Sequence, residues 1–111
     1  MSKRQVKLYV EDINTAIEDI KSFTKDLTFG KFKRNKLVID AVVRNLEVIG
    51  EAAKHIPKEV KNKHPEIAWR KIESMRNRII HEYFNVDLEI VWDTIQKDLT
   101  ILKEQIKNIK D

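Results

Sequence analysis

Residues that interrupt helices are scarce in this chain, which has only two glycines and two prolines among its 111 residues. The strong helix formers Lys, Glu, Leu, Ile and Ala dominate the remainder. This composition predicts an all-α protein. Its length suits one domain with a single hydrophobic core, so we expect residues 1–111 to form one helical domain.

Apolar side chains recur at intervals of three and four residues, the spacing that forms one stripe along a helix. Pro57 is expected to begin a short helix that ends near His64, and Asp87 is the expected N-cap of the last helix. Short connections between antiparallel helices describe an up-and-down bundle. The four main helices are predicted at about residues 3–23, 35–56 and 68–82 and from residue 88 to the end of the chain.

The apolar pattern is lost in one stretch and becomes more regular in another. Residues 24–36 lose the period, contain Gly30 and end in a run of basic side chains, so we expect a loop there. The last predicted helix carries a heptad-like seam, which packs either on its own bundle or on a second subunit. The seam consists of Leu88, Trp92, Ile95, Leu99, Leu102, Ile106 and Ile109.

Composition and spacing exclude several classes of site. The chain has no cysteine, so disulfides, thiolate zinc sites and cysteine nucleophiles are excluded. His55 and His64 have no histidine four residues away and are expected to be ordinary helix-end residues, and we predict neither a metal site nor a cofactor. With no apolar run near the ~20 residues of a membrane span, we expect a cytoplasmic protein. The net charge of +4 permits nucleic-acid binding without requiring it.

One helical stretch combines two side chains suited to phosphate chemistry, Arg76 and His81. Histidine exchanges protons near neutral pH, and arginine offers a planar, permanently charged fork. Each residue turns an α-helix by about 100°. Arg76 therefore lies about 40° around the helix axis from Ile72, at the edge of the apolar face, and His81 lies about 180° from Ile72. Asn77 shares the outer stripe of His81. The arginine and histidine therefore lie about 140° apart, and a compact site would need a twofold dimer.

An arginine at the edge of a core needs a partner, and the preceding long helix supplies candidates in Asn45, Glu47 and Glu51. Asn45 itself lies on the apolar stripe, so its amide also needs a hydrogen-bond partner. Taken alone, however, an Arg and a His at this spacing also occur by chance in helical proteins. His81 could equally stabilise the carboxyl end of its helix through the helix dipole.

Two motifs in the sequence resemble those of a known family. The segment Arg76 to Tyr83, preceded by Trp-Arg-Lys-Ile at residues 69–72, resembles the R-x4-H-x-Y motif of the HepT branch of the HEPN superfamily. Residues 45–54 are similar to the I-G-E-A segment of that branch. Helix order and length correspond over nearly the whole chain.

This resemblance implies a small helical-bundle ribonuclease that acts as the toxin of a toxin-antitoxin pair. In the family the antitoxin is an MNT-type minimal nucleotidyltransferase, which in some members adds AMP to the tyrosine of the motif. HEPN nucleases are generally metal-independent homodimers with the arginine and histidine of both subunits at the interface. Carried over by position, the catalytic residues are Arg76 and His81, the polar position is Asn77, and the modified residue is Tyr83.

Elementary chemistry agrees with these roles. RNA cleavage without metal needs a base to take the 2′-hydroxyl proton, a role for His81, and a cation to stabilise the phosphorane, a role for Arg76. Asn77 can hold the imidazole ring or a phosphate oxygen, and AMP on Tyr83 would crowd the cleft and repel RNA. Tyr83 can equally be an aromatic residue that packs at the helix end.

Several basic residues are candidates for contacts to RNA phosphates, and Arg78 is the best of them because it adjoins the motif. The others, for most of which a solvated face is the simpler interpretation, are Lys31, Lys33, Arg34, Lys36, Arg70 and Lys71. Two other functions stay open at this point. The domain could be a non-catalytic module that docks on a nucleotidyltransferase or binds nucleotide, or a structural homo-oligomer assembled through the heptad-like seam.

Overall fold

A computed structural model describes residues 1–81 and 87–109 of the chain, and the side chains of residues 76–81 are not part of that description. The described residues form helices and connections, with no strand among them, which confirms the all-α prediction. The elements in chain order are α1 (Lys3–Thr24), α2 (Phe29–Lys33), α3 (Lys36–His55), α4 (Lys58–Lys63), α5 (Trp69–His81), α6 (Leu88–Asp93), the π-helical turn η2 (Thr94–Asp98) and α7 (Leu99–Ile106).

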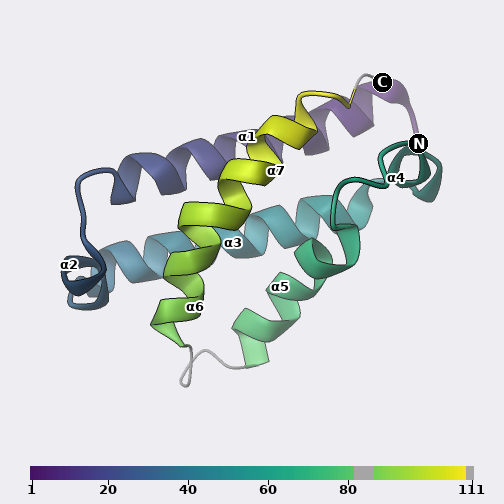
Figure 1. The fold of residues 1–111 in the computed structure, drawn as a ribbon. Helices are drawn as coiled ribbons and strands as arrows, with labels where there is room; N and C mark the ends of the chain where they lie inside the picture. Colours follow the sequence, from purple (N-terminus) through teal and green to yellow (C-terminus); the bar gives the residue numbers. More distant parts are fainter. Residues whose placement is uncertain (82–86, 110–111) are drawn as a thin grey trace.

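Helix α3 is the central element of the bundle. It packs against α1 on one side and α5 on another, and α7 also contacts α1 (Figure 1). The predicted helix over residues 35–56 is confirmed, because Asn35 is the N-cap, its side chain accepting from the Val38 amide at 3.1 Å, and Ile56 is the C-cap. Val43, Leu46 and Ala53 are all buried, because α3 has packing partners on two sides.

The loop predicted over residues 24–36 is wrong in its middle, where α2 forms. Thr28 caps this five-residue helix, its hydroxyl accepting from the Lys31 amide at 3.2 Å. Phe32 is fully buried and lies 5.1 Å from the ring of Trp92, centroid to centroid. A helix of one and a half turns is too short to show a helical period, so only the threonine cap indicated it.

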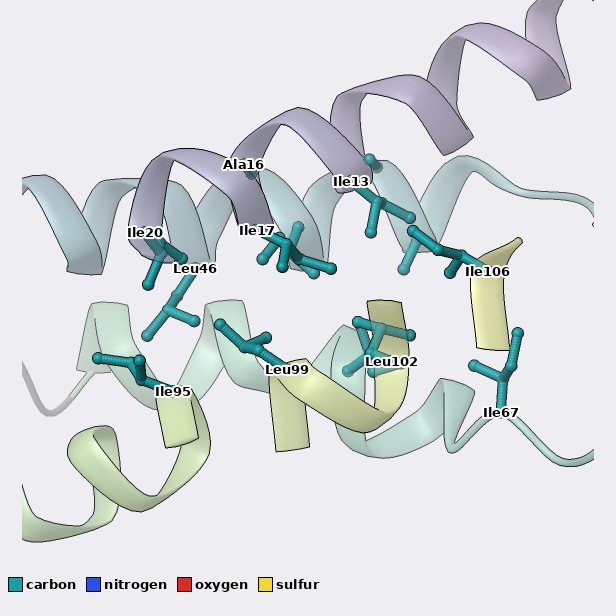
Figure 2. Packing of buried hydrophobic residues seen from close by; sticks show 14 of the residues in the cluster. Ile13, Ala16, Ile17, Ile20, Leu46, Ile67, Ile95, Leu99, Leu102 and Ile106 are labelled. Carbon is teal, nitrogen blue, oxygen red and sulfur yellow. The ribbon is translucent and has the colours of Figure 1, made fainter. Parts of the chain in front are cut away.

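The hydrophobic core lies where α1, α3 and the α6–α7 segment meet. Figure 2 shows Ile17 and Ile20 of α1 facing Leu99 and Leu102, with Leu46 of α3 beside them. Each of these five side chains is at least 96% buried. Burying such a side chain contributes about 1.5–3 kcal/mol, so this cluster is a major source of the stability of the fold.

The last helix contains a π turn that the sequence pattern did not predict. Asp87 is the N-cap of α6, as expected, and its carboxylate accepts a hydrogen bond from the Glu89 amide at 3.0 Å. The buried residues Val91, Ile95 and Leu99 are spaced four and four, which on a regular α-helix turns the stripe by about 80°. The π turn η2 has more residues per turn than an α-helix, so it cancels this rotation and keeps the three side chains on the core side.

The heptad-like seam packs on its own bundle, which settles the alternative left open by the sequence. Ile95, Leu99, Leu102 and Ile106 are all buried within the single chain. Helix α7 is also tied to α1 by polar contacts: Lys103 pairs with Glu18, and this hydrogen-bonded ion pair lowers the pKa of the Glu18 carboxyl below its ordinary value. No helix in the described ranges has both the length and the apolar composition required to cross a bilayer.

Candidate active site

Helix α5, which bears the Arg76 to His81 stretch, is anchored at its first residue. Trp69 is buried, and its indole nitrogen Nε1 donates a hydrogen bond to the His64 carbonyl at 3.0 Å. The Lys61 ammonium lies 5.7 Å from the centroid of the same ring, within cation–π range. The short helix α4, predicted from Pro57 and confirmed at Lys58–Lys63, thereby fixes the point at which α5 begins.

Among the side chains that the structure describes, two ion pairs hold α5 to the elements beside it. Lys61 of α4 lies 2.8 Å from Glu73, and Lys71 lies 3.2 Å from Asp98 at the end of the π turn. The first pair is the better shielded, with the Lys61 side chain only 14% exposed. Shielding from water strengthens an ion pair, so the Lys61–Glu73 pair is the one more able to fix the position of α5.

The core-facing side of α5 is as predicted, since Ile72 is buried and Met75 packs against the core. A pocket of about 220 Å³ lies between α5 and the α6–α7 segment. Its lining is mostly apolar and includes the Lys71–Asp98 pair and Gln105, whose amide donates to the Glu66 carbonyl at 2.9 Å. Met75, which precedes Arg76, is one of the residues that line this pocket.

The α-helical backbone continues through His81, so Arg76 and His81 lie on one helix, as predicted. Helix geometry puts position 81 about 180° round the axis from the buried Ile72. The side chains of Arg76, Asn77, Arg78 and His81 are outside the described residues, as is Tyr83 entirely. Their roles therefore stay predictions.

The two supporting residues on α3 have partners within their own helix. The half-buried Asn45 donates from Nδ2 to the Ala41 carbonyl at 2.9 Å, which supplies the partner that its position required. Glu51 Oε1 lies 3.2 Å from His55 Nε2, and Glu51 Oε2 is buried. That Asn45 or Glu51 orients Arg76 stays a prediction, supported by the packing of α3 against α5.

The remaining histidines have structural contacts. The His55 ring stacks on Tyr9 with a centroid separation of 5.3 Å and an interplanar angle of 14°. His64 Nδ1 lies 3.4 Å from Glu66 Oε2. Sequence reasoning missed the Tyr9–His55 pair, because its members are far apart in the chain and neither belongs to a motif. Among the described residues, no three His, Cys, Asp or Glu side chains are grouped as metal ligands would be.

Comparison with known proteins places this arrangement in a family. The model of the family described as "Ribonuclease HepT-like" matches residues 13–109. A Thermococcus cleftensis protein named as a probable ribonuclease HepT is 44% identical over 97% of this chain and 98% of its own length. A Methanocaldococcus jannaschii protein named as a candidate RNase is 41% identical over 98% of this chain and 94% of its own length.

A third relative, from Caldanaerobacter subterraneus subsp. tengcongensis and also named as a candidate RNase, is 41% identical over 91% of this chain and 90% of its own length. No solved structure matches the chain. The family model and the relatives span nearly all of the described bundle, including the whole of α5. The chain belongs to the HepT-like ribonuclease family.

Proposed function

We propose that the protein is a metal-independent endoribonuclease in which His81 is the general base and Arg76 stabilises the transition state. The observation that carries the proposal is the family match over residues 13–109, which includes both residues and the helix on which they lie. Arg78, on the same helix, is proposed to contact an RNA phosphate.

The proposed reaction is an internal transfer at one phosphate of the RNA backbone. His81 takes the proton of the 2′-hydroxyl, and the 2′-oxygen attacks the adjacent phosphorus to form a phosphorane. Arg76 compensates the negative charge that develops on the non-bridging oxygens. The bond to the 5′-oxygen then breaks and that oxygen takes up a proton, which leaves a 2′,3′-cyclic phosphate and a 5′-hydroxyl.

The site is proposed to be completed in a homodimer that forms through α3 and α5. Support comes from one side of α3 that the bundle covers only in part: Leu37 is 81% exposed, Ala41 is half-buried, and Val48 is half-buried while it also packs against the core. These residues, with Arg44 between them, follow a spacing of four, three and four along one face. An accessible apolar stripe beside the helix of the motif suits a self-complementary interface.

The reaction chemistry predicts a specific dependence on the 2′-hydroxyl. We expect the protein to cleave single-stranded RNA in the presence of EDTA, to produce 2′,3′-cyclic phosphate ends and to leave DNA of the same sequence intact. Denaturing gels and mass spectrometry of the fragments measure this. Cleavage that requires a divalent ion, or 5′-phosphate ends, would contradict the mechanism. Intact RNA together with stable binding to a nucleotidyltransferase would favour the non-catalytic binding module.

Regulation is proposed to act at Tyr83, through an MNT-type nucleotidyltransferase that serves as antitoxin. AMP joined to the tyrosine oxygen adds a phosphodiester charge and an adenosine next to the motif, which would repel and obstruct RNA. With ATP, magnesium and the partner, the mass of the chain should rise by one adenylate, on the peptide that contains Tyr83, and RNA cleavage should fall in parallel. An unchanged mass, or adenylate on another residue, would count against this regulation.

A further inference from the structure

One end of the molecule carries six exposed basic side chains, here called the terminal basic patch. Figure 1 shows the amino terminus and α4 at this end. The stacking of Tyr9 on His55 joins the start of α1 to the end of α3 there. The patch consists of Lys3, Arg4 and Lys7 of α1, Lys54 of α3, and Lys58 and Lys63 of α4.

These six cations differ from several other basic side chains because no carboxylate oxygen of the described residues lies within ion-pair distance of them. Within residues 1–81 and 87–109, no ion pair involves any of the six. Five other lysines of the same ranges are paired with acids: Lys36, Lys61, Lys71, Lys103 and Lys107. The exposed acids of α1, α3 and α4 without such a pair are Glu11, Asp12, Asp19 and Glu59, and Asp19 lies toward the other end of α1. The patch therefore has a clear excess of positive charge, which attracts polyanions.

A second basic cluster, formed by Lys31, Lys33, Arg34 and Lys36 at α2 and the start of α3, is less available to a polyanion. The Lys33 ammonium lies 6.0 Å from the centroid of the Phe29 ring, Lys36 pairs with Asp40 at 2.8 Å, and Asp26 lies nearby in the sequence. Lys31 and Arg34 remain exposed there. Charge therefore favours the terminal basic patch over the α2 cluster as a surface for nucleic acid.

The stacked rings of Tyr9 and His55 lie at the same end of the molecule as the terminal basic patch. The His55 ring has one face on Tyr9, and 48% of the His55 side chain is exposed to solvent. Contact with Glu51 Oε1 at 3.2 Å fixes the orientation of the ring. Proteins that bind single-stranded nucleic acid combine cationic surfaces with flat rings on which bases stack. The Tyr9–His55 pair has the geometry of such a platform.

We propose that this end of the protein is a binding surface for single-stranded RNA, in which the terminal basic patch contacts phosphates and one base stacks on His55. The identity of the polyanion as RNA rests on the proposed ribonuclease function. Helix α4 leads into the start of α5, and the 13 residues of α5 span about 20 Å to His81. An RNA strand of several nucleotides would therefore engage both the surface and the proposed catalytic residues.

The test measures binding without turnover, by fluorescence anisotropy with a 2′-O-methyl RNA of about 20 nucleotides. The variant K54Q/K58Q/K63Q should bind at least tenfold more weakly at ~0.1 M salt. The slope of the logarithm of its binding constant against the logarithm of the salt concentration should be smaller by about two. The matched control K31Q/K33Q/R34Q removes the same charge from α2 and should have a much smaller effect. His55→Ala should weaken binding several-fold and His55→Tyr should restore it, since tyrosine also stacks.

Circular dichroism confirms that each variant is folded before its affinity is compared. Equal losses in the two triple variants, an unchanged affinity in K54Q/K58Q/K63Q, or a wild-type protein that does not bind the RNA would overturn the proposed surface. Because the RNA cannot be cleaved, these results do not depend on catalysis. A wild-type protein that binds through the patch but leaves unmodified RNA intact would instead overturn the ribonuclease proposal and retain the surface.

Discussion

Replacing His81 with alanine is expected to abolish RNA cleavage while the bundle stays folded. In the proposed mechanism this variant lacks the imidazole that takes the 2′-hydroxyl proton, and general acid–base catalysis of this kind contributes about 10²–10⁴-fold. Residue 81 is the last residue of α5, and alanine is the best helix former, so the helix should persist. Initial rates on end-labelled RNA measure the loss, and thermal unfolding followed by circular dichroism measures the fold.

His64→Ala is the matched control for this variant. It removes another imidazole from the chain, and the hydrogen bond that anchors Trp69 uses the backbone carbonyl of residue 64, which the substitution leaves in place. The control variant should cleave RNA at close to the wild-type rate. Cleavage retained by His81→Ala would contradict the assignment of the base, and an equal loss in both variants would indicate damage to the fold in place of lost chemistry.

The sequence predicted the long elements of the fold well, for identifiable reasons. The helices that became α1, α3 and α5 each carry an apolar stripe over several turns, which repeats often enough to be distinguished from chance. Asp87 was also predicted correctly, because an aspartate before an apolar helix is a specific capping pattern. The pattern failed at α2, which is too short to repeat, and at η2, because the alternating seam of Trp92, Ile95 and Leu99 also fits a regular helix.

For the candidate site, the sequence indicated the helix and its orientation but not what holds it. The buried Ile72 and the core contact of Met75 agree with the predicted inner face of α5. By contrast, the anchoring of Trp69 on the His64 carbonyl depends on how α4 and α5 meet, which no local pattern encodes. Asn45 was correctly predicted to need a partner, but its actual partner, the Ala41 carbonyl, is a contact within α3.

One chain is proposed to carry half of an active site. Arg76 and His81 are about 140° apart on their helix, so in a shared cleft each residue can be supplied by a different subunit. Arg76→Ala and His81→Ala homodimers are then each inactive, yet a mixed dimer has one arginine and one histidine left in the cleft. This predicts that activity reappears only when the two variants are combined.

The decisive measurement is RNA cleavage by a heterodimer of Arg76→Ala and His81→Ala, co-expressed with different affinity tags and purified over both. Native mass spectrometry confirms its composition, and the two mutant homodimers and the wild-type dimer are assayed beside it. We expect the heterodimer to regain a measurable part of the wild-type rate, at least tenfold above either homodimer, because acid–base catalysis is restored. A pure heterodimer as inactive as the two homodimers would contradict the shared site.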